Sequence, residues 1–374
     1  MREPTPGLFL GLISGTSADG VDAALLDLDP DGRPRAAPAR DCLPLGEDLR
    51  AAIHAAGEDT PLGEACALDR RLAEAFAEAA LRLRARAPAQ TPIHAIGCHG
   101  QTVWHRGGDA GDGATVQLGD PSRIAALTGL PVVADFRRGD LAEGGQGAPL
   151  APAFHAHCWH DPGQDQAVLN LGGIANLTLM PAEGPVTGFD CGPANTLLDT
   201  WAHHHLGTPH DTDGAWAASG RVDRALLARL RADPYFQAEP PKSTDPEYFS
   251  SAWLAARCRG DEAPQDVQAT LVELTAATVA EALAAWGPAG SQRLWVCGGG
   301  AHNTYLMARL QAWCSGMAVA STAALGIDPD DVEAAAFAWL AWARLNGVAG
   351  NLPAVTGAER AAVLGGLYAP RACT

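Results

Sequence analysis

Two apolar runs near the N-terminus are separated by a short polar segment. Residues 8–13 are wholly apolar and residues 21–28 mainly so, whereas residues 14–20 read Ser-Gly-Thr-Ser-Ala-Asp-Gly. Apolar runs of this length, bounded by Gly, Ser and Asp, are typical of strands joined by a turn. The pattern therefore predicts a β-hairpin with a polar tip.

The hairpin is followed by patterns typical of an α/β fold. Helical spacing of apolar residues predicts helices over 49–56, 63–87 and 121–128, and shorter apolar runs predict strands over 39–43, 93–98 and 131–136. The polar residues 99–105 come directly after one of these strands. Open α/β sheets place ligands at such strand ends, so this segment is expected at a ligand edge.

The second half of the chain repeats this outline. Strands are predicted over 167–171 and 177–180 around Gly172-Gly173, and a strand over 294–297 leads into Gly298-Gly299-Gly300. Helices are predicted over 263–286, as scaffold, and over 331–346, packing back against the first lobe. A duplicated α/β unit of this kind predicts two lobes with a nucleotide held between their glycine turns. The expected lobes are residues 1–137 with 334–374, and residues 138–333.

The net charge and the single lysine of the chain exclude some classes of binding protein and enzyme. The net charge of −17 opposes binding to nucleic acid and to anionic membranes, and Lys242 is the only lysine in the 374 residues. It follows Pro240-Pro241, so a Walker-type phosphate loop is excluded.

The cysteines and the N-terminus bear on location. The nine cysteines include no Cys-x-x-Cys pair, the N-terminus lacks a signal-peptide core, and we identify no apolar run near membrane-span length. These features predict a cytoplasmic protein without a disulfide framework.

The polar tip of the hairpin has the composition of a metal-nucleotide site. Gly15 and Gly20 would let backbone approach a ligand, and nearby hydroxyls and turn amides could surround phosphate oxygens. Asp19 and Asp22 add carboxylates that suit a divalent cation between them and the phosphates. The alternative is a tight hairpin whose polar residues only satisfy the turn.

Two further positions carry candidate chemistry. Asp190 lies at the end of a predicted strand before Gly192-Pro193, where its carboxylate could act as a general base or simply serve a turn or helix cap. Lys242 could contact a phosphate or a substrate carboxylate, or be a solvated cation.

The histidines have weaker metal patterns. His99 and His105 lack suitably spaced partners, so loop positions are favoured over ligand positions. The His155, His157 and His160 group and the run 203–205 are interpreted as helix surface, because neighbouring helical positions point to different sides.

The ordered motifs resemble the anhydro-N-acetylmuramic acid kinase family of the actin, hexokinase and Hsp70 ATPase superfamily, which implies a two-lobed, ribonuclease H-like fold. The motifs run in family order over nearly the whole chain: GTSADGVD (15–22), CHGQTVWH (98–105), ADFRRGDLAEGGQGAPLAPAFH (134–155), NLGGIANLT (170–178), GFDCGPANTLLD (188–199), PPKST (240–244), CGGGAHN (297–303) and VEAAAFAWLA (332–341).

The resemblance implies a reaction and a set of roles. ATP, water and 1,6-anhydro-N-acetylmuramic acid would give N-acetylmuramic acid 6-phosphate and ADP, a step in peptidoglycan recycling. Asp190 would take a proton from the attacking water. Glu333 would be a second carboxylate near the sugar, the alternative being a helix N-terminal residue favoured by the helix dipole.

The resemblance also assigns the binding residues. ATP would be bound by Gly15, Thr16, Ser17, Ala18, Asp19, Gly20, Val21, Asp22, Gly172, Gly173, Asn176, Gly298, Gly299 and Asn303. Mg²⁺ would be bound, through ATP, by Asp19 and Asp22. The sugar would be contacted by Gln101, Thr102, Asp135, Arg138, Gln146 and Lys242. A homodimer is the family expectation.

Three other functions compete with this one. A related sugar kinase that phosphorylates an ordinary hydroxyl would need the same hairpin and the same aspartate. A nucleotide-gated binding or chaperone-like protein would have a degenerate site, against which the presence of Asp190, Glu333 and the glycine turns argues. A metal-dependent hydrolase would use the histidines.

Overall fold

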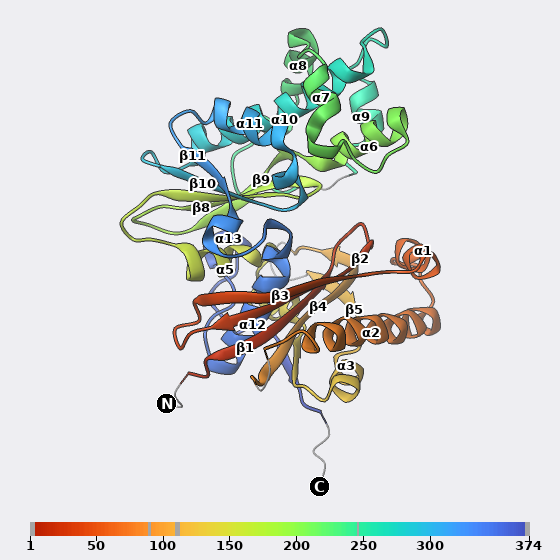
Figure 1. Ribbon diagram of the computed structural model, residues 1–374, viewed down its shortest axis with the longest axis vertical. Helices are drawn as coiled ribbons and strands as arrows, with labels where there is room; N and C mark the ends of the chain where they lie inside the picture. The colour runs from red at the N-terminus through yellow and green to blue at the C-terminus, as the bar shows by residue number, and fades with distance from the viewer. Residues whose placement is uncertain (1–3, 89–90, 109–112, 245–246, 371–374) are drawn as a thin grey trace. The chain divides into compact units, whose positions relative to one another are not determined.

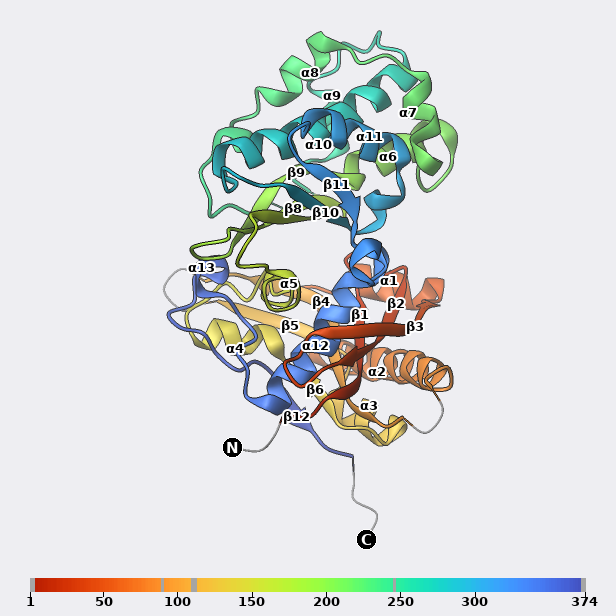
Figure 2. The same cartoon turned by 60° about the vertical axis from the view of Figure 1, so that its left-hand side comes forward.

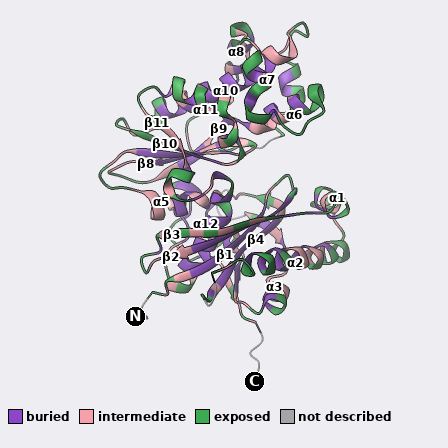
Figure 3. Ribbon diagram, in the orientation of Figure 1, coloured by how far each residue is buried: buried purple, intermediate pink, exposed green. Residues whose placement is uncertain are grey.

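The computed structural model describes residues 4–88, 91–108, 113–244 and 247–370, shown in Figures 1 and 2. The chain divides into two compact units: unit 1 is Met1–Trp159 with Asp331–Thr374, and unit 2 is His160–Asp330. Each unit has its own β-sheet and helices, and Figure 3 shows the buried residues concentrated on the strands and on the helix faces that cover them. The chain therefore leaves unit 1 once and returns to it at the start of its last long helix.

Unit 1 is built on a mixed sheet in the order β12-β6-β4-β1-β2-β3, with β5 paired to β4. The strands are β1 (Gly7–Ser14), β2 (Gly20–Leu28), β3 (Pro34–Pro44), β4 (Ile93–Arg106), β5 (Ala114–Leu118), β6 (Val132–Ala134) and β12 (Gly366–Tyr368). The helices are α1 (Glu47–Ala55), α2 (Leu62–Arg84), α3 (Pro121–Thr128), α4 (Phe136–Ala142), α5 (Ala151–Trp159), α12 (Val332–Asn346) and α13 (Pro353–Thr356). The predicted hairpin is confirmed, since β1 and β2 pair antiparallel.

The helix α12 packs directly on strands β1 and β4. A Cβ on Gly11 would lie 1.7 Å from the carbonyl oxygen of Ala334, and one on Gly97 would lie 1.9 Å from that of Phe337. Both glycines are therefore required because the helix backbone touches the sheet. The prediction that the last long helix returns to the first lobe is confirmed.

Unit 2 repeats the same sheet on a smaller scale. Its strands are β7 (Gln166–Leu171), β8 (Ile174–Met180), β9 (Thr187–Pro193), β10 (Arg293–Cys297) and β11 (Ala318–Ser321), in the order β11-β10-β7-β8-β9. Its helices are α6 (Asn195–Leu206), α7 (Ala215–Ser219), α8 (Arg224–Arg231), α9 (Ser251–Ala255), α10 (Pro264–Trp286) and α11 (Thr304–Trp313). Short 3₁₀ helices are η1 (Thr212–Gly214), η2 (Pro234–Gln237), η3 (Gly299–His302), η4 (Thr322–Leu325) and η5 (Pro329–Asp331).

The two sheets have equivalent topology. In each, the first three strands form an antiparallel meander and the fourth pairs parallel to the first. That fourth strand then pairs parallel with β6 in unit 1 and with β11 in unit 2, whereas β5 of unit 1, which pairs antiparallel with β4, is an addition to the shared order. Internal duplication, predicted from the repeated order of strands and glycine turns, is thus confirmed at the level of sheet topology.

Several predicted boundaries are wrong. β4 continues through the polar residues 99–106, of which residues 101–106 pair with β5, so these residues do not follow a strand end. The first lobe extends to Trp159 rather than to residue 137, and unit 2 ends at Asp330 rather than at residue 333. α5 belongs to unit 1 because His157 hydrogen-bonds the carbonyl oxygen of Asp31 and its ring packs on Trp339.

The helix α10 is long and apolar enough, by length and composition, to cross a membrane, which the sequence analysis overlooked. Most of the helix is buried within unit 2, where Val267, Leu271, Val272, Leu274 and Val279 belong to the core. Its apolar composition is accounted for by this burial.

Candidate active site

The turn between β1 and β2 is tight and strained. The amide of Ala18 donates to the carbonyl oxygen of Gly15 at 3.1 Å, and Ala18 has φ = 53° while being fully buried. A left-handed conformation is unfavourable for alanine and is maintained only where the surroundings impose it, often at functional sites. Gly15 has open space where a Cβ would stand, whereas a Cβ on Gly20 would lie 2.7 Å from Cys42 Sγ and 3.0 Å from the carbonyl oxygen of Leu43 on β3. Gly20 therefore has a packing role that the sequence analysis did not anticipate.

Two buried polar atoms beside this turn have no protein partner in the described structure. They are Ser14 Oγ and Gln101 Oε1, and the two residues are register partners on β1 and β4. The side-chain nitrogen Nε2 of Gln101 donates to the carbonyl oxygen of Gly15 at 3.3 Å. Unpaired buried polar groups are rare and call for an explanation, and a polar ligand at the turn would supply their partners.

The two aspartates at this turn have protein partners. Asp19 forms an ion pair with Arg50 at 2.7 Å, and both side chains are substantially exposed. Asp22 lies on β2 opposite Cys42 on β3, and burial together with the neighbouring Asp22 carboxylate raises the pKa of the Cys42 thiol to about 12. The remaining turn residues assigned to ATP, Thr16 and Ser17, are exposed, and Val21 is buried in the core.

The glycine turns of unit 2 lie beside the start of α6. The carbonyl oxygen of Gly172 accepts from the amide of Asn195, and that of Gly173 accepts from the amides of Ala194 and Thr196. The side chain of Asn195 donates to the Leu171 carbonyl at 2.8 Å and lies 3.2 Å from where a Cβ on Gly300 would stand. Asn195 thus links the two glycine turns, although the sequence analysis did not select it.

Gly298 adopts φ = 78° and leaves no room for a side chain, because a Cβ would lie 2.5 Å from Asn170 Oδ1. Its amide donates to the carbonyl oxygen of Pro329 at 2.8 Å. The side chain of Asn303, assigned to ATP by the resemblance, accepts from the amide of Leu306 and caps α11.

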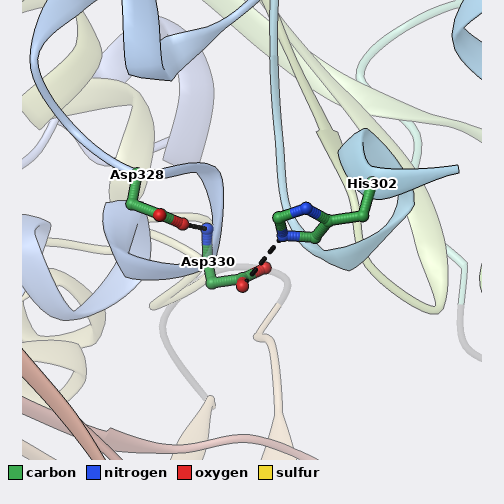
Figure 4. Close-up of side chains that lie close together, drawn as sticks. All are labelled: His302, Asp328 and Asp330. Carbon is green, nitrogen blue, oxygen red and sulfur yellow. Dashed lines mark hydrogen bonds and ion pairs between the residues drawn. The ribbon is translucent and has the colours of Figure 1, made fainter. Parts of the chain in front are cut away.

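A second contact ties residues 328–330 to the same glycine turn. His302 Nε2 lies 2.9 Å from Asp330 Oδ2, and the amide of Asp330 donates to Asp328 Oδ1 at 3.1 Å (Figure 4). These three side chains are close enough to hold a metal ion, but they already hydrogen-bond one another and the Asp330 amide at a largely exposed position. We interpret the cluster as a structural brace.

Asp190 has the environment expected of a general base. It lies within β9, not at its end, and its Oδ1 accepts from Asn176 Nδ2 at 2.7 Å while its Oδ2 accepts from the amide of Thr244 at 3.0 Å. Burial raises the pKa of Asp190, while these two hydrogen bonds and the Lys242 charge act to lower it. Asn176, which the resemblance assigned to ATP, therefore orients Asp190.

Glu333 lies in the first turn of α12 and is exposed. Burial lowers the pKa of Arg137 in α4, and the charges of Glu333 and Asp140 raise it. Arg137 also donates to His99 Nε2 and to the carbonyl oxygen of Gly147, both at 2.9 Å. Arg137 was not selected from the sequence, since its role depends on packing.

The remaining sugar candidates in unit 1 have protein partners. The hydroxyl of Thr102 accepts from Gln117, and the side chain of Gln146 donates to the carbonyl oxygen of Gly108. Asp135, at φ = 63°, accepts from the Tyr368 hydroxyl at 2.5 Å and pairs with Arg138 at 3.5 Å. Arg138 itself remains exposed.

The histidines are mostly structural. His155 is buried, so its placement on a helix surface was wrong, and burial lowers its pKa to about 3. His160 contacts the carbonyl oxygen of Pro181 at 2.7 Å, and residues 203–205 are exposed on α6, as predicted. His99 is buried, and its ring packs on Phe337.

Two sheets of equivalent strand order, each with a polar or glycine-rich turn between its first two strands, define an actin- and hexokinase-like ATPase fold. The family described as anhydro-N-acetylmuramic acid kinase matches residues 7–370. The chain belongs to this family.

Curated relatives agree with this assignment. Anhydro-N-acetylmuramic acid kinase of Xanthomonas campestris pv. campestris (strain 8004) is 52% identical over 96% of this chain and 97% of its own. The protein of the same name from Chromohalobacter salexigens is 50% identical over 97% and 99%. Among solved structures, component A of (R)-2-hydroxyglutaryl-CoA dehydratase from Acidaminococcus fermentans matches with a TM-score of 0.47 at 11% identity, over 90% of this chain and 97% of that chain.

Proposed function

We propose that the protein uses ATP and water to convert 1,6-anhydro-N-acetylmuramic acid to N-acetylmuramic acid 6-phosphate and ADP. The two curated relatives described above are named anhydro-N-acetylmuramic acid kinase, after this activity. The observation in this chain that carries the proposal is the carboxylate of Asp190, which is half-buried and hydrogen-bonded at both oxygens. Because both oxygens are hydrogen-bonded, the carboxylate keeps a fixed orientation while it accepts a proton from a water molecule within hydrogen-bond reach.

The reaction divides between bond cleavage and phosphoryl transfer. Asp190 takes a proton from water as the water oxygen bonds to the anomeric carbon and the bridge oxygen leaves that carbon. The freed O6 then takes the γ-phosphoryl group, and ADP is released. Positioned donors stabilise the charge that develops on the phosphoryl oxygens. A general base of this kind contributes roughly 10²- to 10⁴-fold in rate.

The β1–β2 turn is our proposed phosphate site in unit 1. The unpaired buried hydroxyl of Ser14 can donate to a phosphate oxygen, and the open space at Gly15 leaves room for one. The unpaired Gln101 Oε1 accepts only, so it suits a donor such as a sugar hydroxyl. We propose that ATP carries Mg²⁺, with Asp19 and Asp22 as its nearest carboxylates. When bound, the ion neutralises charge on the phosphate oxygens.

The other finer assignments are also proposals. In unit 2, the Gly172-Gly173 and Gly298-Gly299 turns would hold the nucleotide, with Asn195 joining them. Glu333 would assist at the sugar, with Gln101, Thr102, Asp135, Arg138 and Gln146 as sugar contacts. The cysteine usage favours a cytoplasmic location, and a role in peptidoglycan recycling and a homodimer follow from the family expectation.

The test measures ADP release with magnesium-ATP and either the anhydro sugar or plain N-acetylmuramic acid. We expect release with the anhydro sugar only, and a kcat reduced roughly 10²- to 10⁴-fold in Asp190→Asn. Asp261→Asn, a matched change at an exposed ion pair with Arg259 in the same unit, should leave kcat unchanged.

Labelled water separates this reaction from ordinary hydroxyl phosphorylation. In H₂¹⁸O, the label should enter at the anomeric carbon and be absent from the phosphate. Release of ADP with plain N-acetylmuramic acid alone would instead identify a kinase for an ordinary hydroxyl. Negligible turnover with both sugars would favour a nucleotide-gated binding protein.

A further inference from the structure

The only lysine of the chain directs its ammonium group toward backbone carbonyls. Lys242 Nζ donates to the carbonyl oxygen of Tyr235 at 3.1 Å and approaches that of Phe236 at 3.5 Å. It also lies 4.8 Å from the centroid of the Tyr235 ring, within cation–π range. Tyr235 and Phe236 belong to η2, so the lysine joins the loop 240–244 to this short helix. These contacts occupy the ammonium group that the sequence analysis assigned to substrate.

The helix η2 is itself firmly held. Asp233 caps it by accepting from the amide of Tyr235 at 2.9 Å. The same carboxylate accepts from Trp253 Nε1 at 2.8 Å and pairs with Arg257 at 2.7 Å. The carbonyl groups that Lys242 contacts are therefore fixed points within unit 2.

Both the loop and η2 are bonded to Asp190. The amide of Asp190 donates to the carbonyl oxygen of Lys242 at 3.1 Å, and the amide of Thr244 donates to Asp190 Oδ2 at 3.0 Å. The hydroxyl of Tyr235 donates to the carbonyl oxygen of Asp190 at 2.8 Å. The loop thus controls both the backbone and the carboxylate of Asp190, and Lys242 is the side chain that anchors the loop.

We propose that Lys242 is a positioning residue for Asp190, which anchors the loop 240–244 on η2 so that the Thr244 amide holds the Asp190 carboxylate. This inference rests on the proposed role of Asp190 as the general base. It replaces the expectation that Lys242 contacts the sugar or a phosphate. A residue that acts through another should change kcat more than KM.

The charged and titratable groups around Asp190 define a second readout. They are Lys242 on the loop, Tyr235 on η2 and Cys191 on β9, while β8 contributes the neutral Asn176. Burial raises the pKa of both the Cys191 thiol and the Tyr235 hydroxyl, so these two groups stay neutral near pH 7. Lys242 is therefore the cation whose removal should raise the pKa of Asp190. Because the base acts when ionised, the acid limb of kcat should then move to higher pH.

The kinetic test compares Lys242→Met with Lys242→Arg and with Arg224→Met, an exposed cation of the same unit. Lys242→Met keeps the apolar stem and should reduce kcat roughly 10- to 100-fold, with KM for the anhydro sugar changed less than about twofold. The acid limb should shift upward in Lys242→Met and return toward its original position in Lys242→Arg. Arg224→Met should match the unaltered protein. A rise in KM at unchanged kcat, or no change in either constant, overturns the proposal.

A second measurement does not depend on activity. Because the chain has one lysine, labelling with [ε-¹³C]lysine gives one side-chain resonance whose titration reports the pKa of Lys242 directly. Burial should hold this pKa below that of a free lysine, and Asp190→Asn should lower it further by removing a favourable charge. A titration that Asp190→Asn leaves unchanged overturns the coupling. If the coupling is present but Asp190→Asn retains full activity, the proposed base is wrong while the structural link stands.

Discussion

Asp140 is a fully buried carboxylate that joins three segments of unit 1. It accepts from the amide of Gly147 at 2.8 Å, from Asn351 Nδ2 at 2.6 Å and from Thr356 Oγ1 at 2.8 Å. It thereby ties α4 to the glycine-rich loop 143–149 and to the segment around α13. We predict that Asp140→Ala strongly destabilises unit 1.

The magnitude follows from the three donors left behind. An unpaired buried donor costs roughly 1–3 kcal/mol, and removing one partner of a buried charge network costs about 3–5 kcal/mol. Because the three losses share one site, they are not additive, and we expect a decrease of about 3–5 kcal/mol in the free energy of unfolding. Asp140→Asn keeps the oxygen that Asn351 and Thr356 use but sets an amide group against the amide of Gly147, so its loss should be smaller, roughly 1–3 kcal/mol.

Scanning calorimetry and hydrogen exchange measure this effect. At about 2–4 °C per kcal/mol for a unit of this size, the transition of unit 1 should fall by roughly 6–20 °C. Amide exchange should accelerate in residues 143–149 and 351–357. The matched control is Asp48→Ala, which removes an exposed ion pair with Arg71 and should cost less than about 1 kcal/mol. Equal transitions for Asp140→Ala and Asp48→Ala would refute the reasoning.

Three further predictions concern separate positions. Gly11→Ala should prevent unit 1 from folding, as judged by soluble yield, because the backbone of α12 occupies the space where the Cβ would stand. Gly15→Ala should fold normally, because the space where its Cβ would stand is open. Because burial lowers the pKa of His155 to about 3, the free energy of unfolding should fall as pH drops from about 6.5 to about 3. Urea titrations at several pH values give this free energy, and its dependence on pH should be weaker in His155→Phe. The same pH dependence in both proteins would contradict this. Asn195→Ala loses its bond to Leu171 and should raise KM for ATP roughly tenfold with the sugar KM unchanged, and equal effects on both would contradict the assignment.

Local sequence patterns were sufficient for much of the fold. The hairpin around residues 14–20 follows from apolar runs and turn residues, and α3 begins after its capping residue Asp120 and ends before Gly129, as its sequence indicates. The duplicated strand order was visible because each copy carries its own glycine turn. These features depend on residues close together in the chain.

Other features depend on partners distant in sequence. Residues 101–106 have a loop-like composition but form a strand because β5 pairs with them. His155 is buried because α5 packs within unit 1, where the neighbouring Phe154 contacts Trp339 of α12, and helical spacing alone does not report that packing. The motifs selected Asn176 and Lys242 as candidate site residues, but their contacts with Asp190 and η2 could be found only in the folded chain.

The insertion of unit 2 between two parts of unit 1 imposes an order on synthesis. When Trp159 has left the ribosome, the sheet of unit 1 still lacks α12, the helix that contacts Gly11 and Gly97. All residues of unit 2 are made before α12 appears, which takes on the order of ten to thirty seconds at about 5–20 residues per second. A nascent chain therefore carries an uncovered apolar sheet face throughout this interval, while unit 2, being continuous, is able to complete its own contacts first.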